Sequence, residues 1–243
     1  MGRYRAKEIT KVITLSDCHL PHNIHLGSIR EFIQDWQPDQ IILLGDFLNL
    51  DPISHWMIDK KRLVEGKRLK QEYDLANYEI ELLKQSAPEA KIIYAEGNHE
   101  NWIEQYIDKH PEMEGLIELQ DHIKGIDQWI GFNEYYKIGK LYYKHGTSTT
   151  KYHTNKSLEE GINLIYGHTH DIQEMTAVTM FDKQPHKAKS IGCLCSEDMP
   201  YMKKKPNKWV KAFNYAYIRE NGTFNDYTVV ITNGKFTAEG KTY

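Results

Sequence analysis

Five short polar clusters in this 243-residue sequence combine Asp, His, Asn and Gly, and each follows an apolar run. In chain order they are Ser16-Asp17-Cys18-His19, Gly45-Asp46, Gly97-Asn98-His99-Glu100, His145-Gly146 and Gly167-His168-Thr169-His170. Carboxylate and amide oxygens together with imidazole nitrogens suit Mn²⁺, Fe, Zn²⁺ or Ni²⁺. Each cluster alone is a weak signal. Their joint appearance, in order, at predicted strand ends indicates one shared metal site.

The spacing within two clusters favours paired ligands. At the end of a strand, residues i and i+2 point to the same side. Asp17 and His19 are therefore predicted to reach one ion while Cys18 points away, and the same reasoning applies to His168 and His170. The glycines beside these residues let the backbone turn sharply and approach other groups closely.

The elements that would position the clusters alternate between strand and helix in the first half of the chain. Apolar runs predict strands over residues 11–15, 41–44, 92–95, 141–144 and 164–166. Helical periodicity predicts helices over 29–36, 67–85 and 101–109. Because ligands of open α/β sheets bind outside the carboxyl ends of the strands, the clusters are expected to converge there.

The second half of the chain, from about residue 172, is predicted to be mostly strand. The expected strands cover residues 176–181, 188–191, 210–218 and 227–232, and Gly222 and Gly234 mark hairpin turns. An α/β half followed by a β-rich half suggests two packed sheets within one domain spanning residues 1–243.

The composition is that of an ordinary globular protein, with 31 Lys+Arg against 34 Asp+Glu, a formal charge of −3 and 40% hydrophobic residues. This balance excludes a disordered chain and a highly basic nucleic-acid coat protein. The longest apolar run, Ile41 to Leu44, is far shorter than the roughly 20 residues that span a bilayer. Three cysteines cannot all pair, so Cys193 and Cys195 are expected to be buried thiols. We therefore expect a cytoplasmic protein that makes no membrane contact.

The ordered clusters resemble the motifs of the calcineurin-like metallophosphoesterases, over residues 16–170. Gly192-Cys193-Leu194-Cys195, with Tyr201, Trp209 and Asn233-Gly234, resembles the tail of phage-type members. The resemblance implies a four-layer α/β/β/α sandwich of two mixed β-sheets, with a dinuclear metal site at the strand carboxyl ends. If the protein is phage-encoded, the resemblance also implies that it is located in the cytoplasm of the host cell.

The resemblance further implies which residues hold two divalent ions. The first ion would be bound by Asp17, His19, Asp46 and His170, and the second by Asp46, Asn98, His145 and His168. Among the candidate metals Mn²⁺ is favoured, with Fe, Zn²⁺, Ni²⁺ and Mg²⁺ as alternatives. A hydroxide bridging the ions would attack phosphorus. His99 would then protonate the leaving group or help to hold the phosphate.

One stretch departs from the pattern of the serine/threonine protein phosphatases, which carry Gly-Asp-x-Val-Asp-Arg-Gly. Here the run is Gly45-Asp46-Phe47-Leu48-Asn49-Leu50-Asp51. Asn49 replaces the Asp that would orient the catalytic His, and Leu50 replaces the phosphate-binding Arg. Asp51 is the candidate substitute for the lost carboxylate. Protein phosphatase activity is correspondingly disfavoured.

Residues outside the metal set suggest the substrate. Basic residues are concentrated over 60–70 and 203–211 and could follow a phosphate backbone, a solvated surface being the alternative. The candidate substrate contacts are Asn49, His153, Lys203, Lys204 and Lys205, although a surface position is favoured for His153. A phosphodiesterase or nuclease acting on nucleic acid or nucleotides is slightly preferred over a phosphomonoesterase. A catalytically silent, metal-bound scaffold is the alternative of another class. The sequence leaves the oligomeric state open.

Overall fold

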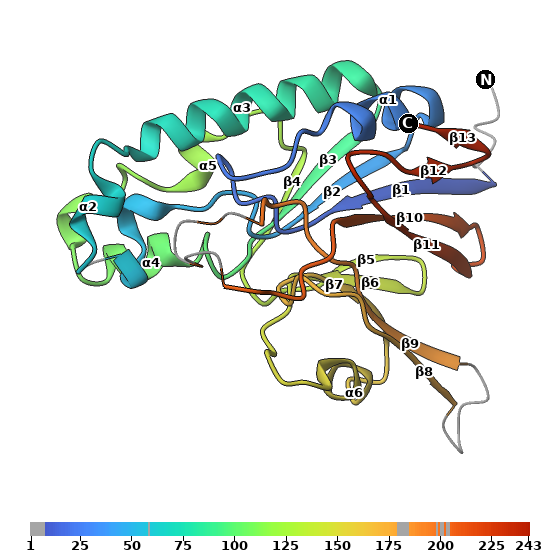
Figure 1. Ribbon diagram of the computed structural model, residues 1–243. Helices are drawn as coiled ribbons and strands as arrows, with labels where there is room; N and C mark the ends of the chain where they lie inside the picture. Colours follow the sequence, from blue (N-terminus) through green and yellow to red (C-terminus); the bar gives the residue numbers. More distant parts are fainter. Residues whose placement is uncertain (1–7, 58, 179–184, 198, 200–201, 203–204) are drawn as a thin grey trace, which may run out of the picture.

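Two β-sheets packed face to face, with helices on both outer faces, form the architecture of the chain (Figure 1). The computed structural model describes residues 8–57, 59–178, 185–197, 199, 202 and 205–243. The layers run from α1 and α3, through the two sheets, to α6. This arrangement confirms the predicted four-layer α/β/β/α sandwich.

The first sheet has six strands in the order β11-β10-β1-β2-β3-β4. Strands β1 to β4 pair in parallel, whereas β10 is antiparallel to both β1 and β11. Their bounds are β1 Ile9–Leu15, β2 Gln40–Leu44, β3 Lys91–Ala95, β4 Gln128–Ile130, β10 Ala212–Arg219 and β11 Phe224–Val230.

The second sheet has five strands in the order β5-β6-β7-β9-β8, and it is also mixed. Strands β6, β7 and β9 are parallel, and β5 and β8 flank them in antiparallel pairing. The bounds are β5 Tyr136–Ile138, β6 Leu141–Lys144, β7 Asn163–Tyr166, β8 Glu174–Val178 and β9 Pro185–Ser190. A separate hairpin joins β12 Thr237–Ala238 to β13 Lys241–Thr242.

The central strands are apolar on both faces because each face packs on another layer. In β2, Ile42 and Leu44 pack into the core between the sheets, together with Val12 of β1. Ile41 and Leu43 of the same strand pack on the opposite side, in the core beneath the helices. This burial on both faces explains the uninterrupted apolar runs in the sequence.

Helix α3 Leu69–Ser86 confirms the long amphipathic helix predicted over 67–85. It buries Tyr73, Ala76, Ile80 and Leu83 at three- and four-residue spacing. It covers the first sheet together with α1 Gly27–Trp36. The outer face of the second sheet is covered by α6 His153–Leu158, whose Leu158 packs against the cluster that contains Leu164.

The remaining helical elements are short. Several of the short helices and strands were not predicted from the sequence. They are η1 Asp51–Ile53, η2 His55–Met57, α2 Lys61–Val64, α4 Trp102–Ile107, η3 Pro111–Met113 and α5 Leu119–His122. The helix expected over 101–109 forms as α4, but β4, β5 and α6 were not predicted because three to six residues carry too little periodicity. The strand expected over 176–181 forms as β8, and residues 179–181 lie outside the described residues. In the described part of the chain, no helix has the length and apolarity needed to cross a bilayer.

A buried carboxylate ties α3 to the loop after β2. Glu72 is 4% exposed, and it accepts a 2.6 Å hydrogen bond from the backbone N–H of Leu50. Leu50 has a φ of 53°, a left-handed conformation that this contact helps to hold. Burial raises the pKa of Glu72 to about 7. The folded protein therefore binds a proton that the unfolded chain releases near pH 4.5.

The raised pKa predicts that Glu72 destabilises the fold as pH rises. Between pH 4.5 and 7 the folded state binds more protons than the unfolded state, so the free energy of unfolding decreases with pH. The Glu72→Gln variant keeps a carbonyl acceptor but cannot ionise. We expect its stability relative to wild type to increase by about 3 kcal/mol between pH 4.5 and 8 in urea unfolding. Exposed Glu81→Gln on the same helix should show no such gain. Parallel pH profiles for wild type and Glu72→Gln would contradict the prediction.

Candidate metal centre

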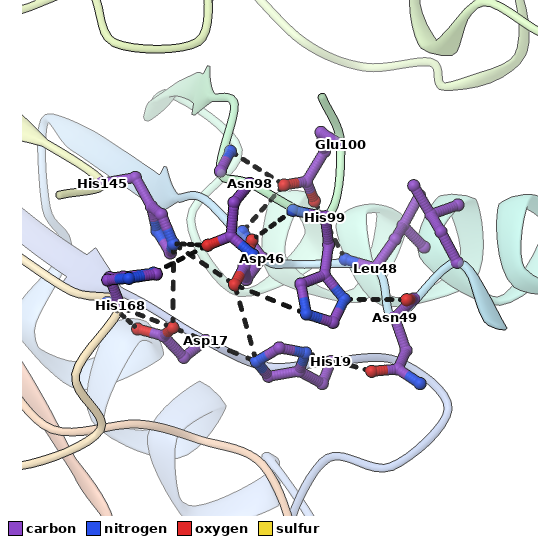
Figure 2. A network of polar contacts seen from close by, with 12 residues as sticks. Asp17, His19, Asp46, Leu48, Asn49, Asn98, His99, Glu100, His145 and His168 are labelled. Atoms are coloured by element: carbon purple, nitrogen blue, oxygen red, sulfur yellow. Dashed lines mark hydrogen bonds and ion pairs between the residues drawn. The ribbon is translucent and has the colours of Figure 1, made fainter. Parts of the chain in front are cut away.

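The loops that follow β1 and β2 run side by side at one end of the first sheet, as Figure 2 shows at close range. The backbone N–H of Asp17 donates to the carbonyl of Gly45 (3.1 Å), and that of His19 donates to the carbonyl of Asp46 (2.9 Å). Leu20 and Phe47 continue the pairing at 2.9 Å. This pairing extends the parallel register of β1 and β2 beyond the strands and places Asp17 and His19 beside Asp46.

Most of the predicted ligands have a left-handed backbone conformation. Positive φ values occur at Asp17 (53°), His19 (52°), Asp46 (47°), His168 (71°) and His170 (59°). This region costs a non-glycine residue on the order of 1–3 kcal/mol, and it is concentrated at functional sites. The strand-end geometry from which the Asp17-x-His19 and His168-x-His170 pairs were predicted is therefore wrong, although the Asp17 and His19 side chains still converge.

Strand β1 ends at Leu15, so Asp17 and His19 lie beyond its pleat and converge through turns. Cys18 between them points away from the centre, as predicted, and is fully buried in the core under the helices.

Two glycines are required where the loops meet. A Cβ atom on Gly97 would collide with the backbone nitrogen and the carboxylate of Asp46. A Cβ atom on Gly167 would collide with the hydroxyl of Ser16. Glycine at these positions therefore allows segments that are distant in sequence to approach within contact distance.

The carboxylate of Asp46 lies at the centre of the cluster and is 2% exposed. Its Oδ2 is 3.2 Å from Nε2 of His145, 3.8 Å from Nε2 of His19 and 3.9 Å from Nε2 of His99. Its Oδ1 accepts a 2.9 Å hydrogen bond from the backbone N–H of His99. Asp46 thus contacts groups on two sides.

On one side of Asp46 lie Asn98, His145 and His168. The amide oxygen of Asn98 is 2.7 Å from Nδ1 of His168 and 3.2 Å from Nε2 of His145. Potential ligand atoms of Asp46, His145 and His168 all lie within 4.8 Å of one another. This is the set predicted for the second ion.

On the other side lie Asp17, His19 and His170. Nε2 of His170 is 3.1 Å from Oδ1 of Asp17 and 3.2 Å from Nε2 of His19. Two imidazole nitrogens that face each other need a proton or a cation between them. The structure therefore brings together all the predicted ligands, and the convergence of oxygen and nitrogen donors fits divalent cations.

Backbone and amide acceptors fix the imidazole rings. Nδ1–H of His145 donates to the carbonyl of Leu44 (2.8 Å), and Nδ1–H of His19 donates to the amide oxygen of Asn49 (3.1 Å). The orientation of the Asn49 amide follows from its Nδ2, which donates to Asp51 at 2.7 Å. Both rings consequently present Nε2 to the centre, as metal-binding histidines do.

The His99 ring is oriented by a main-chain carbonyl and not by the carboxylate that the sequence comparison suggested. Its Nδ1–H donates to the backbone carbonyl of Asn49 (2.8 Å), and its ring stacks on Trp102 at 3.8 Å between centroids. The Asn49 side chain orients His19, not His99, and Asp51 bonds to the Asn49 amide, His22 and Lys67. The orientation of His99 therefore needs no carboxylate in place of Asn49. The hydrogen-bond acceptor for its Nδ1–H is the main-chain oxygen of residue 49, which any residue type supplies.

The buried charges shift one another's pKa values. Burial lowers the pKa of His145, but the carboxylates of Asp46 and Asp17 outweigh it and raise the pKa to about 10. Burial likewise lowers the pKa of His170, and Asp17 raises it to about 10. Burial raises the pKa of Asp17, while His170 and His145 lower it to about 2. Without metal the carboxylates therefore hold protons on the imidazoles, and a cation that binds there must displace them.

Glu100 has a role that the sequence analysis missed. It lies two residues before α4, which begins at Trp102, and it is 2% exposed. Its carboxylate accepts hydrogen bonds from the backbone N–H groups of Asp46 (2.8 Å), Leu48 (3.1 Å) and Gly97 (2.8 Å). The hydroxyl of Tyr94 also donates to it, at 2.9 Å. Glu100 therefore fixes the loop that carries Asp46.

Other predicted residues lie around this centre. Cys193 and Cys195 are buried as expected, and Sγ of Cys195 is 3.7 Å from Nδ1 of His170. The favoured surface position of His153 is wrong. The residue is 2% exposed, 2.7 Å from the Tyr166 hydroxyl and 3.0 Å from Asp171. These partners come later in the chain, so its burial had no local signal.

Of the lysines named as substrate contacts, Lys205 is exposed, whereas Lys203 and Lys204 lie outside the described residues.

Comparison with known proteins identifies the family. The model of the calcineurin-like phosphoesterases matches residues 10–233, so the chain belongs to this family. The Gene 54 protein of Mycobacterium phage D29 is 23% identical over 251 aligned positions, which cover 95% of this chain and 97% of that protein. Among solved structures, Zn²⁺-complexed Vps29 from Entamoeba histolytica has 16% identity and a TM-score of 0.48, covering 96% of this chain and 99% of that one. An archaeal phosphodiesterase has 16% identity and a TM-score of 0.41, covering 90% and 99%.

The contacts of Glu100 predict a large loss of stability on truncation. Glu100→Ala leaves three buried N–H groups and a hydroxyl without their acceptor, at roughly 1–3 kcal/mol for each group. We expect the free energy of unfolding in urea to decrease by at least about 3 kcal/mol. Tyr94→Phe removes one donor and should cost about 1 kcal/mol, and exposed Glu104→Ala should cost almost nothing. Glu100→Gln should fold and bind Mn²⁺ about 10–100-fold more weakly. Unchanged Mn²⁺ affinity would contradict the positioning role.

Proposed function

We propose that this protein is a metal-dependent phosphodiesterase that hydrolyses nucleic acid or nucleotide esters. The observation that carries the proposal is the position of Asp46 between two sets of His, Asp and Asn donors. One carboxylate shared by two sets is the arrangement that two-metal phosphoester hydrolases require.

The contacts described above support two ligand sets. Asp17, His19, Asp46 and His170 would hold one divalent ion, and Asp46, Asn98, His145 and His168 the other. When bound, the ions would polarise the phosphoryl oxygens and acidify the water that attacks phosphorus. We propose Mn²⁺ as the working ion, one of several divalent metals that carboxylate, amide and imidazole ligands suit.

His99 is proposed as the general acid. The carbonyl of Asn49 occupies its Nδ1–H, so only Nε2 can face the reacting group. Stacking on Trp102 restricts rotation of the ring. Nε2–H would transfer its proton to the leaving oxygen as the bond from phosphorus to that oxygen breaks.

The charge of the site supports a diester over a monoester. The serine/threonine protein phosphatases carry an arginine at the position where this chain has Leu50. The Leu50 side chain is fully buried in the core. Leu50 cannot pair with the second negative charge of a phosphomonoester. A diester carries a single negative charge, so the loss of the arginine matters less. Exposed Lys60, Lys61 and Arg62 are available to a polyanionic substrate nearby.

A substrate panel tests the proposal. The purified protein with Mn²⁺ is assayed against bis-p-nitrophenyl phosphate, p-nitrophenyl phosphate, and single- and double-stranded DNA. We expect diester turnover to exceed monoester turnover, and DNA cleavage to decrease steeply with salt because phosphate contacts release counterions. Asp46→Asn damages both ligand sets, so bound metal and turnover should decrease together to background. Exposed Asp74→Asn is the matched control.

The panel separates the proposal from its alternatives. Turnover of the monoester alone would assign a phosphomonoesterase. Stoichiometric metal binding without turnover of any substrate would assign an interaction scaffold and refute the proposed hydrolase.

The general-acid role predicts a dependence on the leaving group. A p-nitrophenolate ion leaves without a proton, whereas the alkoxide released from DNA needs one. His99→Ala should therefore reduce DNA cleavage about 100-fold or more while affecting p-nitrophenyl diesters much less. Kinetics on both substrates provide the measurement, with exposed His25→Ala as the control. An equal loss on both substrates would show that His99 holds the phosphate instead.

A further inference from the structure

We infer that a cavity beside His99, lined by Trp56 and Trp102, binds the aromatic base of the leaving nucleoside. The inference rests on the proposed phosphodiesterase function and specifies the substrate class of that site. The cavity has a volume of about 280 Å³.

The position of the cavity assigns it to the leaving group. His99 and Asn49 form part of its wall, so it opens directly beside the metal centre. In the proposed reaction water adds to phosphorus, the bond from phosphorus to the leaving oxygen breaks, and Nε2 of His99 gives that oxygen its proton. Because the leaving oxygen must approach His99, the group attached to it extends into the space next to His99.

The chemistry of the cavity wall suits a planar aromatic ring. The Trp56 side chain is 64% exposed, although it is a large apolar group beside a buried polar centre. Met57 and Trp102 are 3% and 6% exposed and form an apolar wall. Exposed aromatic rings beside a phosphate-binding centre are the usual platforms on which bases stack. The side chain of Ser or Thr in a phosphoprotein offers no surface that would use Trp56.

The charge at the cavity suits a nucleotide rather than an uncharged aromatic alcohol. The lining also contains the carboxylate of Asp51, which is already paired with Lys67 and the Asn49 amide. Exposed Lys60 in the same lining can pair with a phosphate that follows the base. Beyond Trp102 lies a second cavity of about 280 Å³, which shares Ser54 and Met57 with the first and reaches Lys109. Space and one positively charged side chain therefore continue from the first cavity past Trp102.

The test compares dinucleotides that differ only by one base. Wild-type protein with Mn²⁺ cleaves thymidylyl-thymidine, and chromatography identifies the nucleoside released without phosphate as the leaving one. The paired substrate carries a tetrahydrofuran abasic residue at that position. We expect kcat/KM for the complete dinucleotide to exceed that for the abasic one by at least about tenfold, as stacking of one base predicts.

Variants assign the preference to Trp56. Trp56→Ala should reduce the ratio of the two kcat/KM values to near one, and Trp56→Phe should retain most of it because a ring remains. Tyr78 on α3 is 59% exposed and provides a matched aromatic control. Tyr78→Ala should keep the wild-type ratio.

The outcomes distinguish failure of the inference from failure of the proposed function. If metal-loaded wild type cleaves neither the dinucleotides nor any diester of the substrate panel, the phosphodiesterase proposal and this inference are both overturned. If it cleaves DNA but neither dinucleotide, only the base site is overturned. If both dinucleotides are cleaved with a ratio near one, the function stands and the base site is wrong. A tenfold ratio that persists in Trp56→Ala would likewise refute the assignment of this cavity.

Discussion

The buried carboxylate of Asp46 is the constraint on which the rest of the site depends. An ionised carboxylate that is 2% exposed is costly unless several partners compensate its charge. Here the compensation comes from His19, His99 and His145, and from the backbone N–H of His99. Asp17 adds a second buried carboxylate and raises the pKa of His170 together with that of His145. The fold thus collects negative charge that only protons or cations can balance.

Holding these groups together imposes a conformational cost on the loops. The left-handed residues Asp17, His19 and Asp46 would not adopt that conformation in isolation. Pairing between the loops after β1 and β2, and the hydrogen bonds that Glu100 accepts, stabilise the strained backbone from outside the ligand sphere. Glu72 performs a similar task at Leu50. The carboxylates around the site therefore divide into those that face its centre and those that fix the main chain.

Sequence reasoning identified the ligand candidates because residue types are visible and buried parallel strands leave apolar runs. It could not identify interactions that depend on main-chain atoms or on distant partners. The backbone oxygen of Asn49 carries no sequence signal, so the ring of His99 was assigned to a carboxylate instead. His153 was expected at the surface because Tyr166 and Asp171, which bury it, follow 13 and 18 residues later. The left-handed turns at Asp17 and His168 depend on each other across 151 residues, through the hydrogen bond from His168 N–H to Asp17.

Leu50 links the charge of the site to the shape of its surroundings. With a φ of 53° and its N–H bonded to Glu72, this residue directs its side chain into the core beneath the helices. An arginine on the same backbone would have to bury its guanidinium or break the contact with Glu72, and either change is costly. The conformation of this loop therefore favours an apolar residue at position 50. A positively charged group that pairs with the second negative charge of a phosphomonoester would have to come from another part of the chain. Next to this loop the wall of the centre continues into Met57 and Trp56, which offer contact area instead of charge. Under the proposed function, such an arrangement would select a substrate by the group attached to its phosphate more than by the charge of the phosphate itself.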